Sequence, residues 1–202
     1  MLSPETIRTA PKVLLHDHLD GGLRPSTIIE LAKDLGVTTL PTYNVTELGN
    51  WMTATADRKD LELYLEAFSH TLSVMQTEDG LYRVAAECAE DLANDGIIYA
   101  EVRFAPELHL SEGLTVPRVI ERVLEGFRSG SEGKGIIVNT LICAIRSRTR
   151  SKEMMEHALH FRSRGVVGFD IAGPEIGYPP SDHLTAFLLA VDSNFPVTIH
   201  AG

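Results

Sequence analysis

Short, nearly continuous apolar segments alternate with longer segments of helical periodicity along this chain, and that alternation limits the folds open to it. The strand-like segments cover residues 13–16, 97–104, 136–145, 166–171 and 197–200. Helices are expected between them, over residues 25–36, 61–75, 78–94, 116–128, 152–164 and 182–192. Uninterrupted apolar runs are typical of parallel strands buried on both faces. The sequence therefore predicts an α/β fold, either an open doubly wound sheet or a closed (β/α)8 barrel of the TIM type.

Histidines stand where two of the expected strands end. His16 and His18 are two residues apart, so their side chains leave a strand on the same face while Asp17 points away. His200 ends the last expected strand, and the carboxyl ends of parallel strands meet at one rim. Three neutral imidazoles suit a first-row divalent metal ion, zinc above all. Two histidines at this spacing can also be ordinary polar residues, so spacing alone leaves both interpretations open.

The closed barrel is favoured over the open sheet because no G-x-G-x-x-G follows an expected strand and no P-loop is present. The excursion after the first strand is long, covering roughly residues 19–95. In a barrel, such an excursion lies over the rim that carries active sites. Its segment 61–68 has an apolar stripe, which is either a core-facing surface or a lid over that rim.

Composition indicates one domain that acts on a small molecule. The 202 residues are 44% hydrophobic, enough for a sizeable core. A net charge of −10 argues against nucleic acid and against a membrane surface as partners. No window of 18 apolar residues and no secretory leader is found. Cys88 and Cys143 are predicted to be buried free thiols, which suits a cytoplasmic protein; the oligomeric state stays open.

The remaining histidines and one basic segment are predicted to have no role in the chemistry. Residues 146–152 are expected to form a solvated loop after the third strand. Five histidines are interpreted as structural or surface residues: His70, His109, His157, His160 and His183.

Four segments of the chain match a known family in order. Residues 11–21, PKVLLHDHLDG, resemble the opening motif of the adenosine deaminases, which belong to the metal-dependent amidohydrolases. Residues 99–106, 167–173 and 198–202 resemble further motifs of that family. The resemblance implies zinc-dependent hydrolytic deamination of adenosine and deoxyadenosine to the inosine product and ammonia. Deamination of another purine or of a modified nucleoside by the same chemistry is the alternative within the class.

The resemblance also implies roles for individual residues. His16, His18 and His200 match three ligands of a single zinc ion, and His18 also borders the substrate. Asp20 matches the acid that holds the ribose 5′-hydroxyl, which favours a purine nucleoside over free adenine. Gly173 matches the glycine whose backbone N–H meets purine N3. The helix 61–68 resembles the family's apolar lid, and Arg146 matches an arginine to which no catalytic role is assigned.

Some family residues have no counterpart here. In the family a proton-donating glutamate directly follows the H-A-G triplet, and a later histidine and two aspartates complete the site. Residues 1–202 are therefore expected to form a single incomplete barrel domain with about the first five of eight strands. The chain alone is expected to lack a catalytic residue, to be inactive and to aggregate. A non-catalytic fragment or a metal-binding module is the alternative from another class.

Overall fold

One parallel sheet organises the molecule. The computed structural model describes residues 2–57 and 61–201, and the side chains of residues 61–66 lie outside that description. The described strands are β1 (Lys12–His18), β2 (Ile97–Phe104), β3 (Ile137–Ile145) and β4 (Val166–Ala172). They lie side by side in the order β1-β2-β3-β4, and every pair is parallel. The predicted α/β class with a parallel sheet is confirmed, and the order, which never reverses, is that of a barrel wall rather than a doubly wound sheet.

Eight α-helices accompany the strands in the described part of the chain. The bounds are α1 Pro4–Thr9, α2 Pro25–Leu35, α3 Val45–Ala56, α4 Leu61–Ser73, α5 Glu78–Asn94, α6 Val116–Ser131, α7 Ser151–His160 and α8 Leu184–Asp192. Short 3-10 turns are found at Leu19–Gly21, Pro106–Leu108, Arg162–Arg164 and Pro180–His183. The helices predicted over 25–36 and 78–94 are confirmed almost to the residue, whereas α1 and α3 had no counterpart among the predicted ranges.

Local signals explain where the well-predicted helices begin and end. Thr77 caps α5, because its hydroxyl accepts a hydrogen bond from the backbone N–H of Gly80. Gly36 ends α2 with a φ of +67°, a left-handed conformation that favours glycine. By contrast, the helix expected over 152–164 ends at His160 and continues as a 3-10 turn to Gly165, whose φ is +110°.

The helices α5 and α6 pack against each other unusually closely. A Cβ atom added to Gly130 would lie 2.1 Å from the Ala86 carbonyl oxygen, and one added to Gly126 would lie 2.3 Å from the Tyr82 carbonyl oxygen. Only glycine allows this distance between the two backbones, so both positions set how α6 lies against its neighbour.

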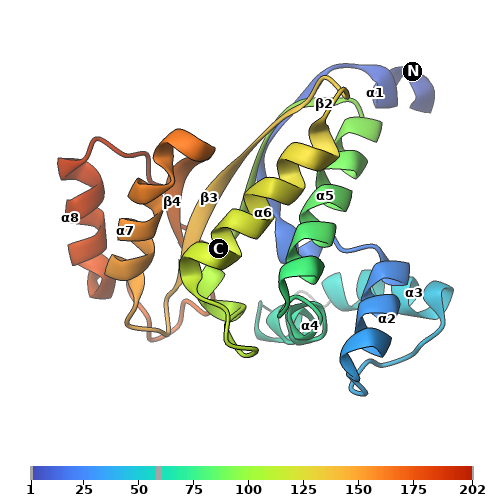
Figure 1. Cartoon of the computed structure of the whole chain (residues 1–202), viewed down its shortest axis with the longest axis horizontal. Helices are drawn as coiled ribbons and strands as arrows, with labels where there is room; N and C mark the ends of the chain where they lie inside the picture. Colours follow the sequence, from blue (N-terminus) through green and yellow to red (C-terminus); the bar gives the residue numbers. More distant parts are fainter. Residues whose placement is uncertain (1, 58–60, 202) are drawn as a thin grey trace.

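Helices cover only one face of the sheet in the part of the chain that is described. Figure 1 shows α5, α6, α7 and α8 on the same side of the strands. On that side Phe169 and Ile171 of β4 are fully buried. On the other side Val13, Leu15 and Ile137 are 58%, 54% and 61% exposed. The prediction that every strand is buried on both faces is therefore wrong for β1 and for the start of β3.

The prediction of a fifth strand is also wrong. Residues 197–200 are not a strand but a segment with one isolated parallel bridge, between Val197 and Phe169. The backbone N–H of Thr198 donates to the carbonyl of Phe169 at 2.9 Å, and that of His200 donates to Ile171 at 3.2 Å. The segment thus follows the edge of β4 with the hydrogen-bond direction of a parallel neighbour. Only one residue pair, Val197 with Phe169, forms a bridge, so the ladder is too short to count as a strand.

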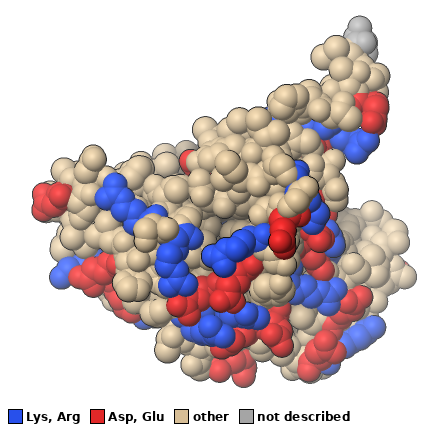
Figure 2. Space-filling view, turned by 45° about the horizontal axis from the view of Figure 1, so that its top comes forward, with Lys and Arg blue, Asp and Glu red and all other residues tan. Residues whose placement is uncertain are grey.

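The excursion between β1 and β2 lies at one end of the sheet. The helices α2, α3 and α4 gather beyond the carboxyl ends of the strands (Figure 1). None of the described helices combines the length and the apolar character that crossing a membrane requires. Figure 2 shows positive and negative side chains interleaved on the face that it presents, so the net charge of −10 is not gathered into a single acidic patch there.

Candidate metal centre and adjoining pocket

Three imidazoles converge at the carboxyl end of the sheet. The Nε2 atoms are 3.2 Å apart between His16 and His18, 3.1 Å between His16 and His200, and 2.9 Å between His18 and His200. The first two come from β1 and the third from the segment beside β4, so residues 184 positions apart meet at one point. A register shift between Leu14 and Asp17 marks a bulge in β1 just where His16 stands.

The geometry of these nitrogens fits a small tetrahedral cation. Three neutral ring nitrogens with their lone pairs turned toward one another repel, and an ion between them removes that conflict. A tetrahedral zinc with Zn–N distances of about 2.0–2.1 Å places its ligand atoms roughly 3.3 Å apart, close to the spacings found here. Each of the three residues offers one ligand atom, and all three atoms lie within 4.8 Å of one another. Three protein ligands also leave the open position that a catalytic site needs.

Two of these imidazoles have pKa values below the ordinary value for histidine. Burial lowers the pKa of His18 to about 4, with His200 and His16 adding smaller effects of the same sign. Burial is likewise the main cause that lowers the pKa of His16. Because a metal binds the neutral imidazole, the site is ready for a cation at neutral pH. Asp17 is placed away from the centre, toward α5, where its charge helps raise the pKa of the Cys88 thiol.

A buried ion pair between Asp170 and Arg103 lies next to His200. Asp170 of β4 is fully buried, and its Oδ2 lies 2.5 Å from Nη1 of Arg103 on β2. The same oxygen lies 2.9 Å from Nδ1 of His200. Burial alone would raise the pKa of Asp170, but the contacts with His200 and Arg103 outweigh it and hold the pKa below its usual value. Sequence reasoning assigned neither residue a role, although a charged residue inside an apolar strand is a signal that could have found both.

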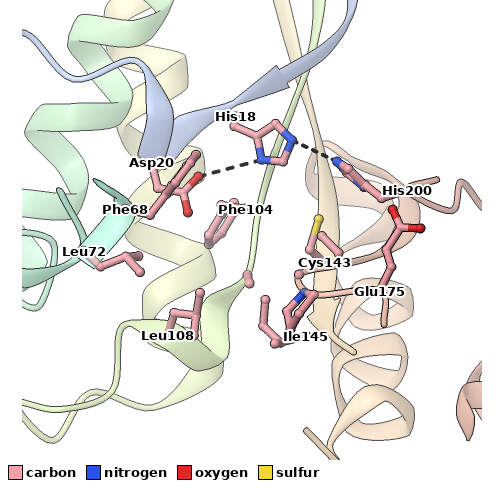
Figure 3. A pocket seen from close by; sticks show the side chains of 14 residues that line it. His18, Asp20, Phe68, Leu72, Phe104, Leu108, Cys143, Ile145, Glu175 and His200 are labelled. Atoms are coloured by element: carbon pink, nitrogen blue, oxygen red, sulfur yellow. Dashed lines mark hydrogen bonds and ion pairs between the residues drawn. The ribbon is translucent and has the colours of Figure 1, made fainter. Parts of the chain in front are cut away.

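An apolar pocket of about 280 Å³ opens beside the centre (Figure 3). His18 and His200 form part of its wall, so a molecule in the pocket lies against the histidine nitrogens. Its remaining walls are mostly hydrophobic, which suits a flat heterocycle. The apolar side chains among its lining are Phe68, Leu72, Phe104, Leu108 and Ile145.

Asp20 borders this pocket as a buried acid without a full set of partners. It is 7% exposed, and its Oδ1 accepts no hydrogen bond. Nδ1 of His18, a neutral imidazole at pH 7, lies 3.9 Å from that oxygen, beyond hydrogen-bond distance. Burial, with a smaller effect of Asp17, raises the pKa of Asp20 to about 6. An ionised, buried and unsatisfied acceptor of this kind is stabilised by a donor on a bound molecule.

Gly173 and α4 complete the pocket. Gly173 follows β4 with a φ of +96°, which favours glycine at this position. Phe68 of α4 brings its ring to 6.4 Å from the ring of His18, and Leu72 lines the pocket one turn further on. The end of the predicted 61–68 stripe therefore faces the pocket rather than only a core. The side chains of Leu61, Tyr64 and Leu65, which complete the predicted stripe, lie outside the described residues.

The prediction that residues 146–152 form a solvated loop is wrong for Arg146. It is 4% exposed and not part of a solvated loop, although it begins the basic segment 146–152. Its Nη1 donates to the Tyr178 carbonyl at 3.2 Å and its Nη2 donates to the backbone carbonyl of His200. His183 contacts the Arg146 carbonyl through Nε2 at 3.1 Å. Arg146 is buried with hydrogen bonds to two backbone carbonyls, one at the end of the chain's last segment and one in the loop after β4.

The fold and this centre together define a class. A parallel barrel wall with three imidazoles and a pocket at the carboxyl ends of its strands is the arrangement of a barrel enzyme, whose active site lies at that rim. The family model for adenosine deaminase matches residues 11–202. The chain therefore belongs to the adenosine deaminase family.

Individual relatives agree with that assignment. The chain is 58% identical to adenosine deaminase 1 of Streptomyces coelicolor over 205 residues, which cover 99% of this chain and 52% of the relative. It is 55% identical to adenosine deaminase of Mycobacteroides abscessus, covering 98% of this chain and 56% of the relative. The chain thus spans about half the length of these curated relatives.

A solved structure confirms the fold. The Arabidopsis N6-mAMP deaminase superposes with a TM-score of 0.84 at 30% sequence identity. The match covers 98% of this chain and 60% of the Arabidopsis chain. The barrel-type architecture predicted from the sequence therefore holds over nearly all of these residues.

Proposed function

We propose that residues 1–202 form the first part of a barrel domain whose reaction is the zinc-dependent hydrolytic deamination of adenosine and deoxyadenosine. The observation that carries the proposal is the meeting of three imidazole Nε2 atoms at the wall of an apolar pocket. In this proposal His16, His18 and His200 hold the zinc ion. A zinc ion bound there supplies Lewis acidity and lowers the pKa of water at its open position to about 7.

The pocket residues would orient the purine. The apolar side chains of Phe68, Leu72, Phe104 and Leu108 line the pocket (Figure 3) and would pack against the faces of the ring. Water is excluded by the same side chains, which strengthens every polar contact inside. Gly173, with no side chain, would let its backbone N–H approach a ring nitrogen of the base.

Asp20 would select the nucleoside. In Figure 3 it lies on the opposite side of His18 from His200, so a substrate that spans the pocket can reach the metal with its base and Asp20 with its sugar. Its unsatisfied Oδ1 accepts a hydrogen bond from the ribose 5′-hydroxyl in this proposal. A hydrogen bond to a charged acceptor contributes roughly 1.5–3 kcal/mol, or about 10- to 150-fold in kcat/KM.

No residue of this chain is proposed here as a proton donor. Hydrolysis at a purine carbon also needs an acid that protonates the ring, and the family resemblance places this acid directly after residues 200–202. The residues of this chain are thus proposed to bind metal and substrate, whereas proton transfer is assigned to residues beyond them.

A modified purine nucleotide is the second candidate substrate. It is favoured by the likeness to the Arabidopsis protein, which is an N6-mAMP deaminase. The buried carboxylate of Asp20 argues against it, because a phosphate on the 5′-oxygen would bring two negative groups together. A nucleoside without phosphate fits this end of the pocket better.

The test uses the full-length protein that contains this chain. Zinc content is measured first, and the conversion of adenosine, deoxyadenosine, adenine and N6-methyl-AMP is then followed by ultraviolet absorbance. We expect zinc and turnover of the two nucleosides. Asp20→Ala should lower kcat/KM for adenosine about 10- to 150-fold and leave the low rate with adenine nearly unchanged. Equal losses for both substrates would remove Asp20 from sugar recognition.

Two other results would overturn the proposal. Preference for N6-methyl-AMP over adenosine would make the protein a nucleotide deaminase. Tight zinc binding without turnover of any purine would make it a metal-binding module, the non-enzymatic alternative.

A further inference from the structure

One buried guanidinium contacts every segment that carries a histidine of the metal centre. Arg103 of β2 has a side chain that is 3% exposed. Its Nη2 donates to the Leu15 carbonyl at 2.9 Å, one residue before His16. Its Nη1 lies 2.5 Å from Oδ2 of Asp170 and 3.4 Å from the hydroxyl of Thr198, two residues before His200.

Arg103 contacts the Leu15 carbonyl at the bulge of β1. Leu15 lies inside the register shift between Leu14 and Asp17, where the strand ladder loses its regular hydrogen bonds. A carbonyl freed by a bulge needs a donor, and here the donor is a charged side chain from the neighbouring strand. Arg103 thus satisfies the carbonyl of the distorted segment that carries His16.

Arg103 also contacts Asp170, which in turn lies beside the ring of His200. The Nδ1 atom of His200 lies 2.9 Å from Oδ2, although the ring hydrogen is not aligned well enough for a regular hydrogen bond. Its Nε2 atom is the one that meets the other two histidines. An acceptor beside Nδ1 favours the tautomer with its hydrogen there, which leaves the Nε2 lone pair for a metal.

We propose that Arg103 is the positioning residue of the metal centre: it holds the β1 bulge through Leu15 and, through Asp170, the metal-binding tautomer of His200. The inference rests on the proposed function, in which these histidines hold zinc. Lysine is not expected to replace Arg103, because the rigid guanidinium presents two separate nitrogens, Nη1 to Asp170 and Nη2 to the Leu15 carbonyl, whereas an ammonium group is a single compact charge.

The experiment compares variants of the full-length protein. Zinc affinity is measured by competition with a chelator, and the cobalt-substituted protein reports coordination through its visible spectrum. Arg103→Lys and Asp170→Asn should each weaken zinc binding about 10- to 100-fold and change the cobalt spectrum. Arg118→Lys is the matched control, since Arg118 pairs with Glu78 at 2.6 Å on the helix surface, and it should change zinc affinity by less than about twofold.

A purely structural ion pair predicts a different result. In that case Arg103→Lys would lower the melting temperature but leave the zinc affinity and cobalt spectrum of the folded protein unchanged, which would overturn the inference alone. Absence of zinc binding in the unmodified protein would instead overturn the proposed function and the inference with it.

A measurement on the unmodified protein covers the case in which Arg103→Lys does not fold. Nitrogen-15 spectra of histidine side chains in the zinc-loaded protein distinguish the two ring nitrogens. We expect the hydrogen of His200 on Nδ1, next to Asp170. A hydrogen on Nε2, or none on Nδ1, would contradict the assignment.

Discussion

The two faces of the sheet are built from alternate residues of the same strands, yet they differ in almost every property. The helix-covered face is a continuous apolar core in which Phe169 of β4 packs on Phe187 of α8, with ring centroids 6.2 Å apart. The opposite face carries exposed aliphatic side chains at one end and the ionisable residues of the metal centre at the other. The first face holds the fold together, and the second carries the candidate chemistry.

The comparison of the two faces explains why polar residues occur within this sheet. Tyr99 donates to Glu101 at 2.8 Å and receives a contact from Asn139 at 3.3 Å, all on the helix-free face. Tyr99 and Asn139 join β2 to β3 in this way, so these half-buried polar groups keep hydrogen-bond partners and their partial burial costs little. On the helix-covered face the strands present mostly hydrocarbon to the helices, as at Ala100, Val102 and Ile142.

The largest expected effect comes from the core side. Phe169→Ala should lower the free energy of unfolding of the full-length protein by about 3–5 kcal/mol, because removal of a fully buried aromatic ring leaves a cavity. The measurement is urea unfolding followed by circular dichroism. A loss below 1 kcal/mol, of the size typical of surface changes, would show that the helix-covered face is not the stabilising one.

A pH effect should follow from a histidine inside the same core. His109 is fully buried, and burial lowers its pKa to about 4, with its contact to the Met75 carbonyl acting in the opposite direction. Above pH 6.5 both folded and unfolded states are neutral at this residue. Between pH 6.5 and about 4 only the unfolded state takes up the proton, so stability should fall by up to about 3 kcal/mol as the pH is lowered.

The control for this prediction replaces the residue. His109→Gln should flatten that part of the stability profile, whereas His160→Gln at an exposed position should not. An unchanged profile in His109→Gln would assign the pH dependence to other groups.

The contact between α5 and α6 should respond to a single methyl group. Gly130→Ala should cost about 1–3 kcal/mol, because the new Cβ meets the Ala86 carbonyl oxygen and the helices must separate. Gly49→Ala is the matched control within α3, where the added Cβ meets only Pro25 at 3.5 Å. That change should instead stabilise the chain by about 0.5–1 kcal/mol. Equal effects of the two substitutions would mean that the helices can move apart freely.

The smallest effect is expected on the helix-free face. Val13→Thr and Ile137→Thr should each change the stability of the 202-residue chain by less than about 0.5 kcal/mol, because both side chains are more than half exposed. Threonine keeps the preference for a strand. If the same substitutions destabilise the full-length protein by more than 1 kcal/mol, further residues cover this face there.

Much of the fold could be read from local patterns. The strand 97–104 and the helix 78–94 were predicted with the bounds that the structure has, because apolar runs and caps are local signals. The helix α3 was not predicted as a separate element, since its stripe is weak and only Leu48 and Thr55 are buried along it. Residues 197–200 read as a strand, yet they have a neighbour only at β4. Pairing depends on partners that a local pattern does not reveal.

The sequence by itself determined the alternation of strands and helices over most of the chain and the identity of the three converging histidines, because strand periodicity and strand ends fix which side chains share a face and a rim. Only the tertiary structure decided the rest of the site. Arg103, Asp170 and Arg146 acquire their places through contacts across 32 to 88 positions of the chain. A charged residue is solvated or buried against a carbonyl according to the groups that the fold places beside it. Those groups come from distant parts of the chain, so the residues next to it in sequence do not reveal them.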